Sequence, residues 1–225
     1  MKQAIAVLGM ALLGFGASAP AQATPLADLL NGATITVGDK LFDQWRLLGR
    51  GLVDTTGTVN LAGIDVVGID ETSLNPGLRF NAGSQLQVAG DNFIDLFFGY
   101  RVSVLPGSNQ AIQDVSFSFD SESYGGDGLT AGIEDVFDTA SNLLGSIELE
   151  ASNQTFVISG SAGFNPQREI QVQSNILLFG FVNGDSAGLD SFTQRFSQTA
   201  IPEPGTLLLF GVALGGLFFP RRARD

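Results

Sequence analysis

The sequence predicts an all-β protein: an antiparallel β-sandwich of jelly-roll type, placed between an N-terminal signal helix and a C-terminal transmembrane helix. Two observations predict the sandwich. Between residues 24 and 200, apolar residues alternate with polar ones over short stretches, as in strands with one face in water. Turn-forming Gly, Asn, Asp and Ser separate these stretches at short intervals, and amphipathic helical patterns are few.

The alternation is clearest at residues 115–119, which read Val-Ser-Phe-Ser-Phe. Two denser apolar runs, 93–100 and 176–182, predict central strands that are buried on both faces. Further strands with one wet face are expected at residues 33–37, 86–88, 102–104, 147–149 and 170–172.

Turns and short helices are expected between these strands. The helices are predicted at residues 25–30 and 135–144. Glycine, proline and asparagine predict turns at residues 75–77, 105–109, 124–128, 164–166 and 183–185.

The first 23 residues have the order of a secretory signal peptide. Met1 and Lys2 begin a short positive region, an apolar run covers Ala4–Ala17, and Ala21 and Ala23 give the small-x-small pattern of a cleavage site. A second candidate site lies four residues upstream, and a retained N-terminal anchor is the alternative. The sequence therefore predicts export through the Sec translocon, with residues 24–200 as the exported domain.

The tail, residues 201–225, has three parts. Pro202-Glu203-Pro204 should be stiff and extended, because proline fixes φ and disfavours helix in the residue before it. An apolar run at 206–219 follows; as a helix it would be roughly 22 Å long, short for a bilayer span. The positive-inside rule would keep the final cations in the cytoplasm as a membrane stop. These cations are Arg221, Arg222 and Arg224.

With these three parts in this order, the tail resembles the PEP-CTERM sorting domain of Gram-negative bacteria. The resemblance implies recognition by an exosortase, a membrane-embedded transpeptidase-like enzyme, and cleavage near Pro202-Glu203-Pro204. It also implies an association with exopolysaccharide production. The body looks, more loosely, like uncharacterised bodies carried by such sorted proteins, and this second resemblance brings no catalytic residues.

Composition restricts the chemistry of the exported domain. Seven Lys and Arg stand against 21 Asp and Glu between residues 24 and 201, a net charge of 7 − 21 = −14. This argues against nucleic acid as a partner. The chain has no cysteine and no histidine, which excludes thiol and histidine catalysis and the usual transition-metal ligands. We expect no enzyme, although a pair of carboxylates, as in glycoside hydrolysis, stays open.

Calcium is the cofactor that the sequence leaves possible. Asp120, Glu122 and Asp127 could supply oxygen ligands around the glycine-rich loop at 125–128. The spacing does not match an EF-hand, and a solvated acidic loop is the alternative. Additional ligands could come from Glu134, Asp135 and Asp138.

Aromatic residues could also provide a carbohydrate platform. The exported domain holds one tryptophan, Trp45, and two tyrosines, Tyr100 and Tyr124, whereas phenylalanine, the usual core aromatic, dominates. We therefore expect Trp45 to be partly buried rather than to stack on a sugar.

Together these observations predict a structural or interaction protein. It would be exported, held transiently in the inner membrane by its tail, processed by an exosortase and displayed at the cell surface or in the exopolysaccharide matrix. The first alternative is a carbohydrate- or calcium-dependent binding module. The second is a permanently anchored single-pass membrane protein.

Overall fold

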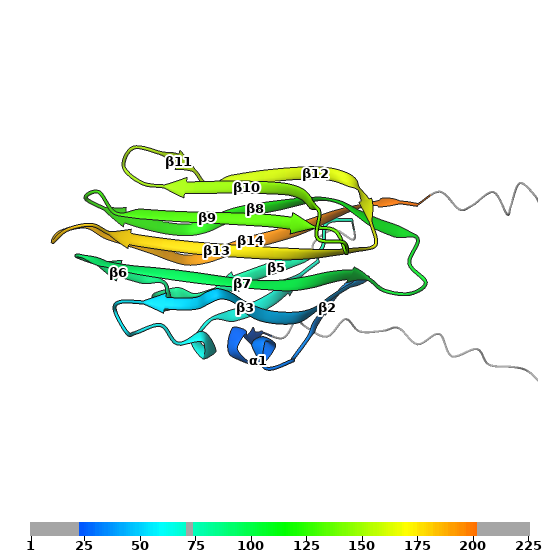
Figure 1. Cartoon of the computed structure of the whole chain (residues 1–225), viewed down its shortest axis with the longest axis horizontal. Coiled ribbons are helices and arrows are strands. Elements are labelled where there is room, and N and C mark those ends of the chain that lie inside the picture. The colour runs from blue at the N-terminus through cyan, green and yellow to red at the C-terminus, as the bar shows by residue number, and fades with distance from the viewer. Residues whose placement is uncertain (1–22, 71–73, 202–225) are drawn as a thin grey trace, which may run out of the picture.

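The computed structural model describes residues 23–70 and 74–201, which form two β-sheets with little helix (Figure 1). The strands are β1 (Thr24–Pro25), β2 (Ile35–Val37), β3 (Lys40–Asp54), β4 (Asp65–Ile69), β5 (Gly77–Asn81), β6 (Gln87–Ala89), β7 (Asn92–Val104), β8 (Gln110–Gly125), β9 (Leu129–Phe137), β10 (Leu143–Ala151), β11 (Phe156–Val157), β12 (Ser159–Gln167), β13 (Glu169–Gly180) and β14 (Ser186–Ala200). The helical pieces are α1 (Leu26–Leu30), η1 (Leu61–Gly63) and η2 (Gly83–Gln85). The predicted all-β sandwich is confirmed.

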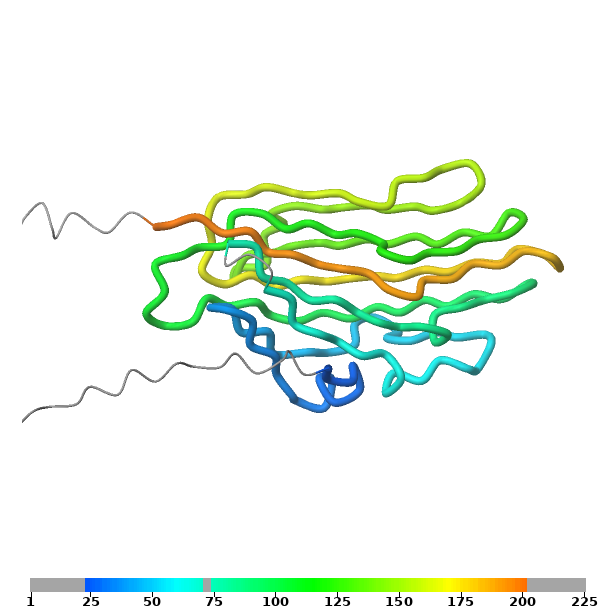
Figure 2. The backbone as a smooth tube through the Cα atoms, turned by 180° about the vertical axis from the view of Figure 1, so that it is seen from behind, coloured from blue at the N-terminus to red at the C-terminus, as the bar shows by residue number. Residues whose placement is uncertain are grey.

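Each sheet has seven strands, and every strand pair between described residues is antiparallel. Sheet A has the order β1-β4-β5-β14-β8-β12, with β6 also paired to β14. Sheet B has the order β11-β10-β9-β13-β7-β3-β2. Figure 1 looks onto sheet B, and the view from behind in Figure 2 shows β14, in orange, crossing the middle of sheet A.

The strand pairs show how the chain is wound. β5 pairs with β14, β7 with β13, β8 with β12 and β9 with β10, so the order of partners runs inward from both ends of the chain. These four pairs belong alternately to sheet A and sheet B. The chain is thus one long antiparallel hairpin wrapped around the core, which is the winding of a jelly roll.

Aromatic rings fill the space between the sheets. Phe80 and Phe192, from β5 and β14, stack with ring centroids 4.4 Å apart and planes 7° apart. On the other sheet, Trp45 stacks on Tyr100 at 4.3 Å. Trp45 also meets Phe80 edge-on at 6.3 Å, which joins the two stacks across the core. The short-period alternation of the sequence places these rings inward.

Of the two short helices predicted from the sequence, the structure contains one. The helix predicted at residues 25–30 is confirmed as α1, whose Leu26 and Leu29 are buried. The helix predicted at 135–144 is wrong, because β9 continues to Phe137 and a turn leads into β10. In that turn, the Asp138 carboxylate accepts hydrogen bonds from the backbone N–H of Ala140 at 2.8 Å and of Asn142 at 2.9 Å.

The turn predicted at residues 164–166 is also wrong, because these residues lie within β12. β12 is an edge strand, and its pairing with β8 is interrupted between Gly163 and Gln167. Pro166, which has no N–H to donate, lies in this interruption and is therefore tolerated. Runs 93–100 and 176–182 do contribute to central strands. Burial on both faces was wrong, since Phe97 on β7 and Leu177 on β13 face outward and are only partly buried, while their neighbours in the same strands are buried.

The core stack gives a stability prediction. Phe192→Ala removes a ring that is 1% exposed and stacked on Phe80, so we expect the free energy of unfolding to fall by about 3–5 kcal/mol. Phe156→Ala, at a ring that is 59% exposed, should change it by about 0.5 kcal/mol or less. Urea unfolding of the purified variants measures both, and equal losses would contradict this core assignment.

Candidate functional site

The predicted sorting residues are in part outside the described chain. Ala23 is described and exposed, immediately before β1. At the other end, the Ile201 N–H donates to the Asn109 carbonyl at 2.7 Å, so ordered backbone reaches the residue before the tripeptide. No helix within residues 23–70 and 74–201 is long and apolar enough to cross a membrane. The residues outside the description are Ala21, Pro202, Glu203, Pro204, Arg221, Arg222 and Arg224.

The structure does not bring the three predicted calcium ligands together. Asp120 and Glu122 lie along β8, where the Asp120 carboxylate accepts a hydrogen bond from Thr193 at 2.5 Å and lies 3.3 Å from the guanidinium of Arg79. Asp127 lies beyond the end of β8. Each strand residue between Asp120 and that end adds about 3.3 Å to the separation of the two carboxylates. Within the described residues, no group of three or more Asp, Glu, His or Cys side chains is placed to hold a metal.

The additional acids suggested for calcium are placed apart as well. Asp138 accepts the hydrogen bonds that hold the β9–β10 turn. Asp135 lies on β9 on the outward face, between the buried Glu134 and Val136. Glu134, between β9 neighbours that face outward, points into the core and is fully buried. Glu134, which the sequence suggested as a calcium ligand near a loop, is therefore a core residue. The reason is that β9 extends through this acidic stretch to Phe137.

Glu134 lies in a polar cluster between the sheets. On sheet B, Ser174 is the strand partner of Glu134. From sheet A, Gln194 accepts a hydrogen bond from the Tyr100 hydroxyl at 2.5 Å and donates one to Ser174 at 2.6 Å. In the described part of the chain, neither carboxylate oxygen of Glu134 has a hydrogen-bond partner. Burial raises the pKa of Glu134 to about 8, although Gln194 nearby partly offsets this and Asp135 adds to it.

Two of the three aromatic residues considered for a sugar platform lie in the core. Trp45 is 6% exposed within the core stack, and Tyr100 is fully buried. Tyr124 is 40% exposed near the end of β8. Trp45→Ala would therefore report on folding rather than on ligand binding.

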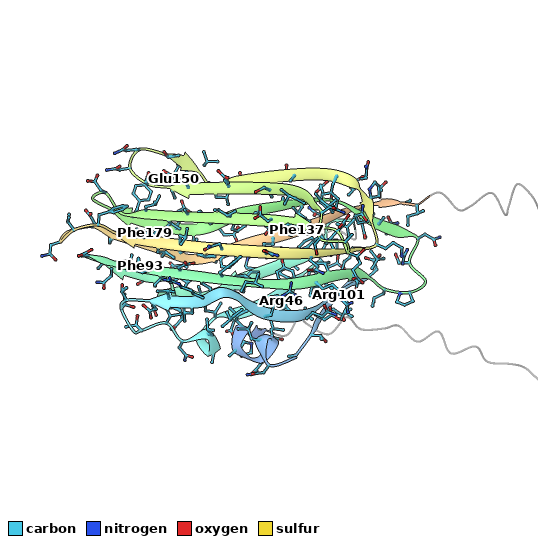
Figure 3. The ribbon with its side chains drawn as sticks, in the orientation of Figure 1. Arg46, Phe93, Arg101, Phe137, Glu150 and Phe179 are labelled. Carbon is cyan, nitrogen blue, oxygen red and sulfur yellow. The ribbon has the colours of Figure 1, made fainter. Side chains whose placement is uncertain are left out.

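The outward face of sheet B carries an aromatic group at one end and an ion-pair group at the other. Phe93 and Phe179 lie side by side on β7 and β13 with centroids 5.7 Å apart, and Phe181 stacks on Phe179 at 5.9 Å (Figure 3). At the other end of β7, the Arg101 guanidinium forms a bidentate pair with Asp43, at 2.6 and 2.8 Å. Side chains on this face thus change from apolar to charged along the strands.

An open pocket lies where β6, β14 and β8 pair, at the end of the sandwich remote from Ile201. Its volume is about 670 Å³, within the range of small-molecule sites. The residues that line it are short and uncharged, and none was singled out from the sequence, where they carry no motif. They are Thr56, Thr58, Ser84, Gln87, Val88, Ala89, Ser123, Ser186 and Ala187.

A glycine lies between two of the residues that line this pocket. On β14, Gly188 pairs with Gln87 on one side and Ser123 on the other. A Cβ at Gly188 would lie 2.7 Å from the Ser123 hydroxyl and 3.4 Å from Gln87. The Ser123 and Gln87 side chains can therefore approach each other over position 188 because this residue has no side chain.

One wall of the pocket is held by a carboxylate. Asp54 accepts hydrogen bonds from the N–H and hydroxyl of Thr56, at 2.8 and 2.5 Å, and from the N–H of Val59 at 2.8 Å. The Thr56 and Thr58 hydroxyls are 2.7 Å apart. Partial burial of Asp54 acts against ionisation, but these hydrogen bonds outweigh it and lower the pKa of Asp54. The wall is thus held in place by its own hydrogen bonds.

Comparison with known families decides the nature of the tail. The family model described as the PEP-CTERM protein-sorting motif matches residues 200–222. The chain carries a PEP-CTERM sorting motif. This confirms the resemblance drawn from the sequence, and the motif indicates exosortase-dependent sorting. The match begins at Ala200, the last residue of β14, so the PEP-CTERM motif follows the sandwich directly.

No curated protein matches the chain. Among solved structures, TmCBM61 in complex with beta-1,4-galactotriose aligns at 15% identity and a TM-score of 0.31, covering 67% of this chain and 87% of that one. Bacteriophage CBA120 tailspike protein 4 aligns at 9% identity and a TM-score of 0.25, covering 70% of this chain and 19% of that one. The arabinose-bound arabinofuranosidase MgGH51 aligns at 12% identity and a TM-score of 0.17, covering 77% and 24%.

The buried glutamate predicts how stability depends on pH. The folded state keeps a proton on Glu134 up to about pH 8, whereas an unfolded chain releases it near the ordinary value of 4.5. The folded state binds more protons in this window, so the free energy of unfolding should fall as pH rises from about 5 to 8, by up to about 1.4 kcal/mol per pH unit from this group. Urea unfolding at several pH values measures the slope.

Glu134→Gln keeps the shape of the side chain and removes the proton. We expect a flatter pH profile and, at pH 8, a variant more stable than the parent. Glu148→Gln, at an exposed glutamate on β10, is the matched control and should leave the slope unchanged. A Glu134→Gln profile parallel to that of the parent would show that Glu134 is ionised in the folded state.

Proposed function

We propose that this chain is an exported structural or interaction protein that an exosortase processes through its PEP-CTERM motif. The Sec translocon would deliver it, the tail would hold it briefly in the inner membrane, and display would follow at the cell surface or in the exopolysaccharide matrix. The observation that carries the proposal is the motif match at residues 200–222, immediately after the last strand.

A non-enzymatic role fits the same chain. The sequence has no histidine and no cysteine, so histidine- or thiol-based catalysis has no residues to use. Glu134 has the raised pKa typical of catalytic acids, but it is fully buried between the sheets. An acid in that position cannot touch a substrate, and a role in the core explains it better.

The experiment that tests the proposal is mass spectrometry of the C-terminal peptide of protein recovered from its host, with and without the exosortase gene. We expect a chain that ends near Pro202–Pro204 only when the enzyme is present. A mature protein that still ends in Asp225 would overturn processed display and would support the permanently anchored alternative.

Replacing the tripeptide should separate sorting from folding. With Pro202→Ala and Pro204→Ala together, we expect the full-length chain to accumulate in the membrane fraction, because the stiff extended segment is lost. The sandwich ends at Ala200, so thermal unfolding of the body should be unchanged. Normal cleavage of the double variant would contradict recognition through the prolines.

A further inference from the structure

We propose that the open pocket where β6 and β8 flank β14 binds a neutral, hydroxyl-rich ligand, namely a sugar unit of an uncharged oligosaccharide or polysaccharide. The pocket belongs to the body of the protein, so this inference does not depend on the fate of the tail. It gives residues to the carbohydrate-binding role that the sequence left as an alternative.

The side chains of the pocket have the chemistry that sugars require. Serine and threonine hydroxyls both donate and accept hydrogen bonds, and the Gln87 amide can do both through its two ends. The hydroxyls of a sugar have the same dual character, so donors and acceptors can be matched in either direction. The exposed Ala89 provides apolar contact for the C–H groups of a sugar ring, whereas Val88 and Ala187 are buried beneath the surface of the pocket.

The absence of charge in the lining selects against other ligands. The body has a net charge of −14, yet none of the nine lining residues is charged. Two carboxylates that contact lining residues are already engaged: Asp54 holds the threonine wall, and Asp190 accepts from the Gln87 amide at 3.3 Å. Anionic sugars would approach these carboxylates and an acidic domain without a compensating cation, which disfavours them.

The pocket is also preorganised. The Asp54 hydrogen bonds fix Thr56, and the Asn60 N–H donates to Gln85 at 2.8 Å, which ties the loop after β3 to η2. On the opposite side, Ser123 and Ser186 stand on paired strands of sheet A. Polar groups that are ordered before binding lose little conformational entropy when a ligand arrives, so the net gain per hydrogen bond is larger.

The test is isothermal titration calorimetry of the purified full-length protein. The probes are neutral tri- to hexasaccharides of glucose, galactose and mannose, and uronic acid oligomers of the same lengths. We expect saturable binding of at least one neutral series and weaker or no binding of the uronic acid series. No binding across the neutral series, or tighter binding of the uronic acids, would overturn the proposal.

Variants localise the binding. Gln87→Ala and Ser123→Ala each remove one hydrogen-bonding side chain and should weaken binding about two- to tenfold. Gly188→Val would displace the Ser123 and Gln87 side chains and should abolish binding, with circular dichroism to check that the variant folds. Ser161→Ala, at an exposed serine on β12 outside the pocket, should bind like the parent. Binding that survives both Gln87→Ala and Gly188→Val would place the sugar elsewhere and overturn the assignment.

Discussion

The position of β14 in the middle of sheet A is the constraint on which the rest of the structure depends. It pairs with β5, β6 and β8 and sends Phe192 and Phe196 into the core. Its partners lie far upstream in the sequence, so sheet A cannot close before the last strand arrives. A fold dominated by such distant contacts forms slowly, which is compatible with translocation of an unfolded chain.

Polar groups within the core are a second consequence of that strand. Gln194 and Gln198 alternate with the phenylalanines on the inward face of β14. The fully buried Lys40 meets Gln198 and the Asp39 carboxylate, and Tyr100 meets Gln194. Buried polar contacts of this kind cost desolvation energy, but they are satisfied only when the two sheets face each other in one register. Glu134 on β9 differs from these groups, since neither of its carboxylate oxygens has a hydrogen-bond partner among the described residues and burial raises its pKa.

Much of the fold was readable from the sequence because alternation and turn residues act locally. The strands at 115–119 and 170–172 follow directly from a two-residue period, and the sandwich follows from their number. The errors came where composition suggested an irregular loop or a helix but pairing with a neighbour extended a strand, as at Phe137 and Pro166. Whether such a segment forms a strand depends on the strand it pairs with, and a local sequence pattern carries no information about that partner.

The sorting motif was predictable for the opposite reason, since an ordered set of short linear features needs no tertiary structure. The pocket was not predictable, because its residues are common ones drawn from separate parts of the chain. Thr56, Ser84 and Ser186 become neighbours only through the winding of the jelly roll. Even Gly188, which lies within β14 between Gln87 and Ser123, belongs to no motif that the sequence analysis could single out.

The direction of β14 has a consequence for presentation. The strand runs for 15 residues, roughly 50 Å, from Ser186 beside the pocket to Ala200 beside the sorting motif. The pocket and the sorting motif therefore lie at opposite ends of the same strand. A ligand bound beside Ser186 would leave the Ala200 end uncovered, so an occupied pocket would not obstruct access to the motif.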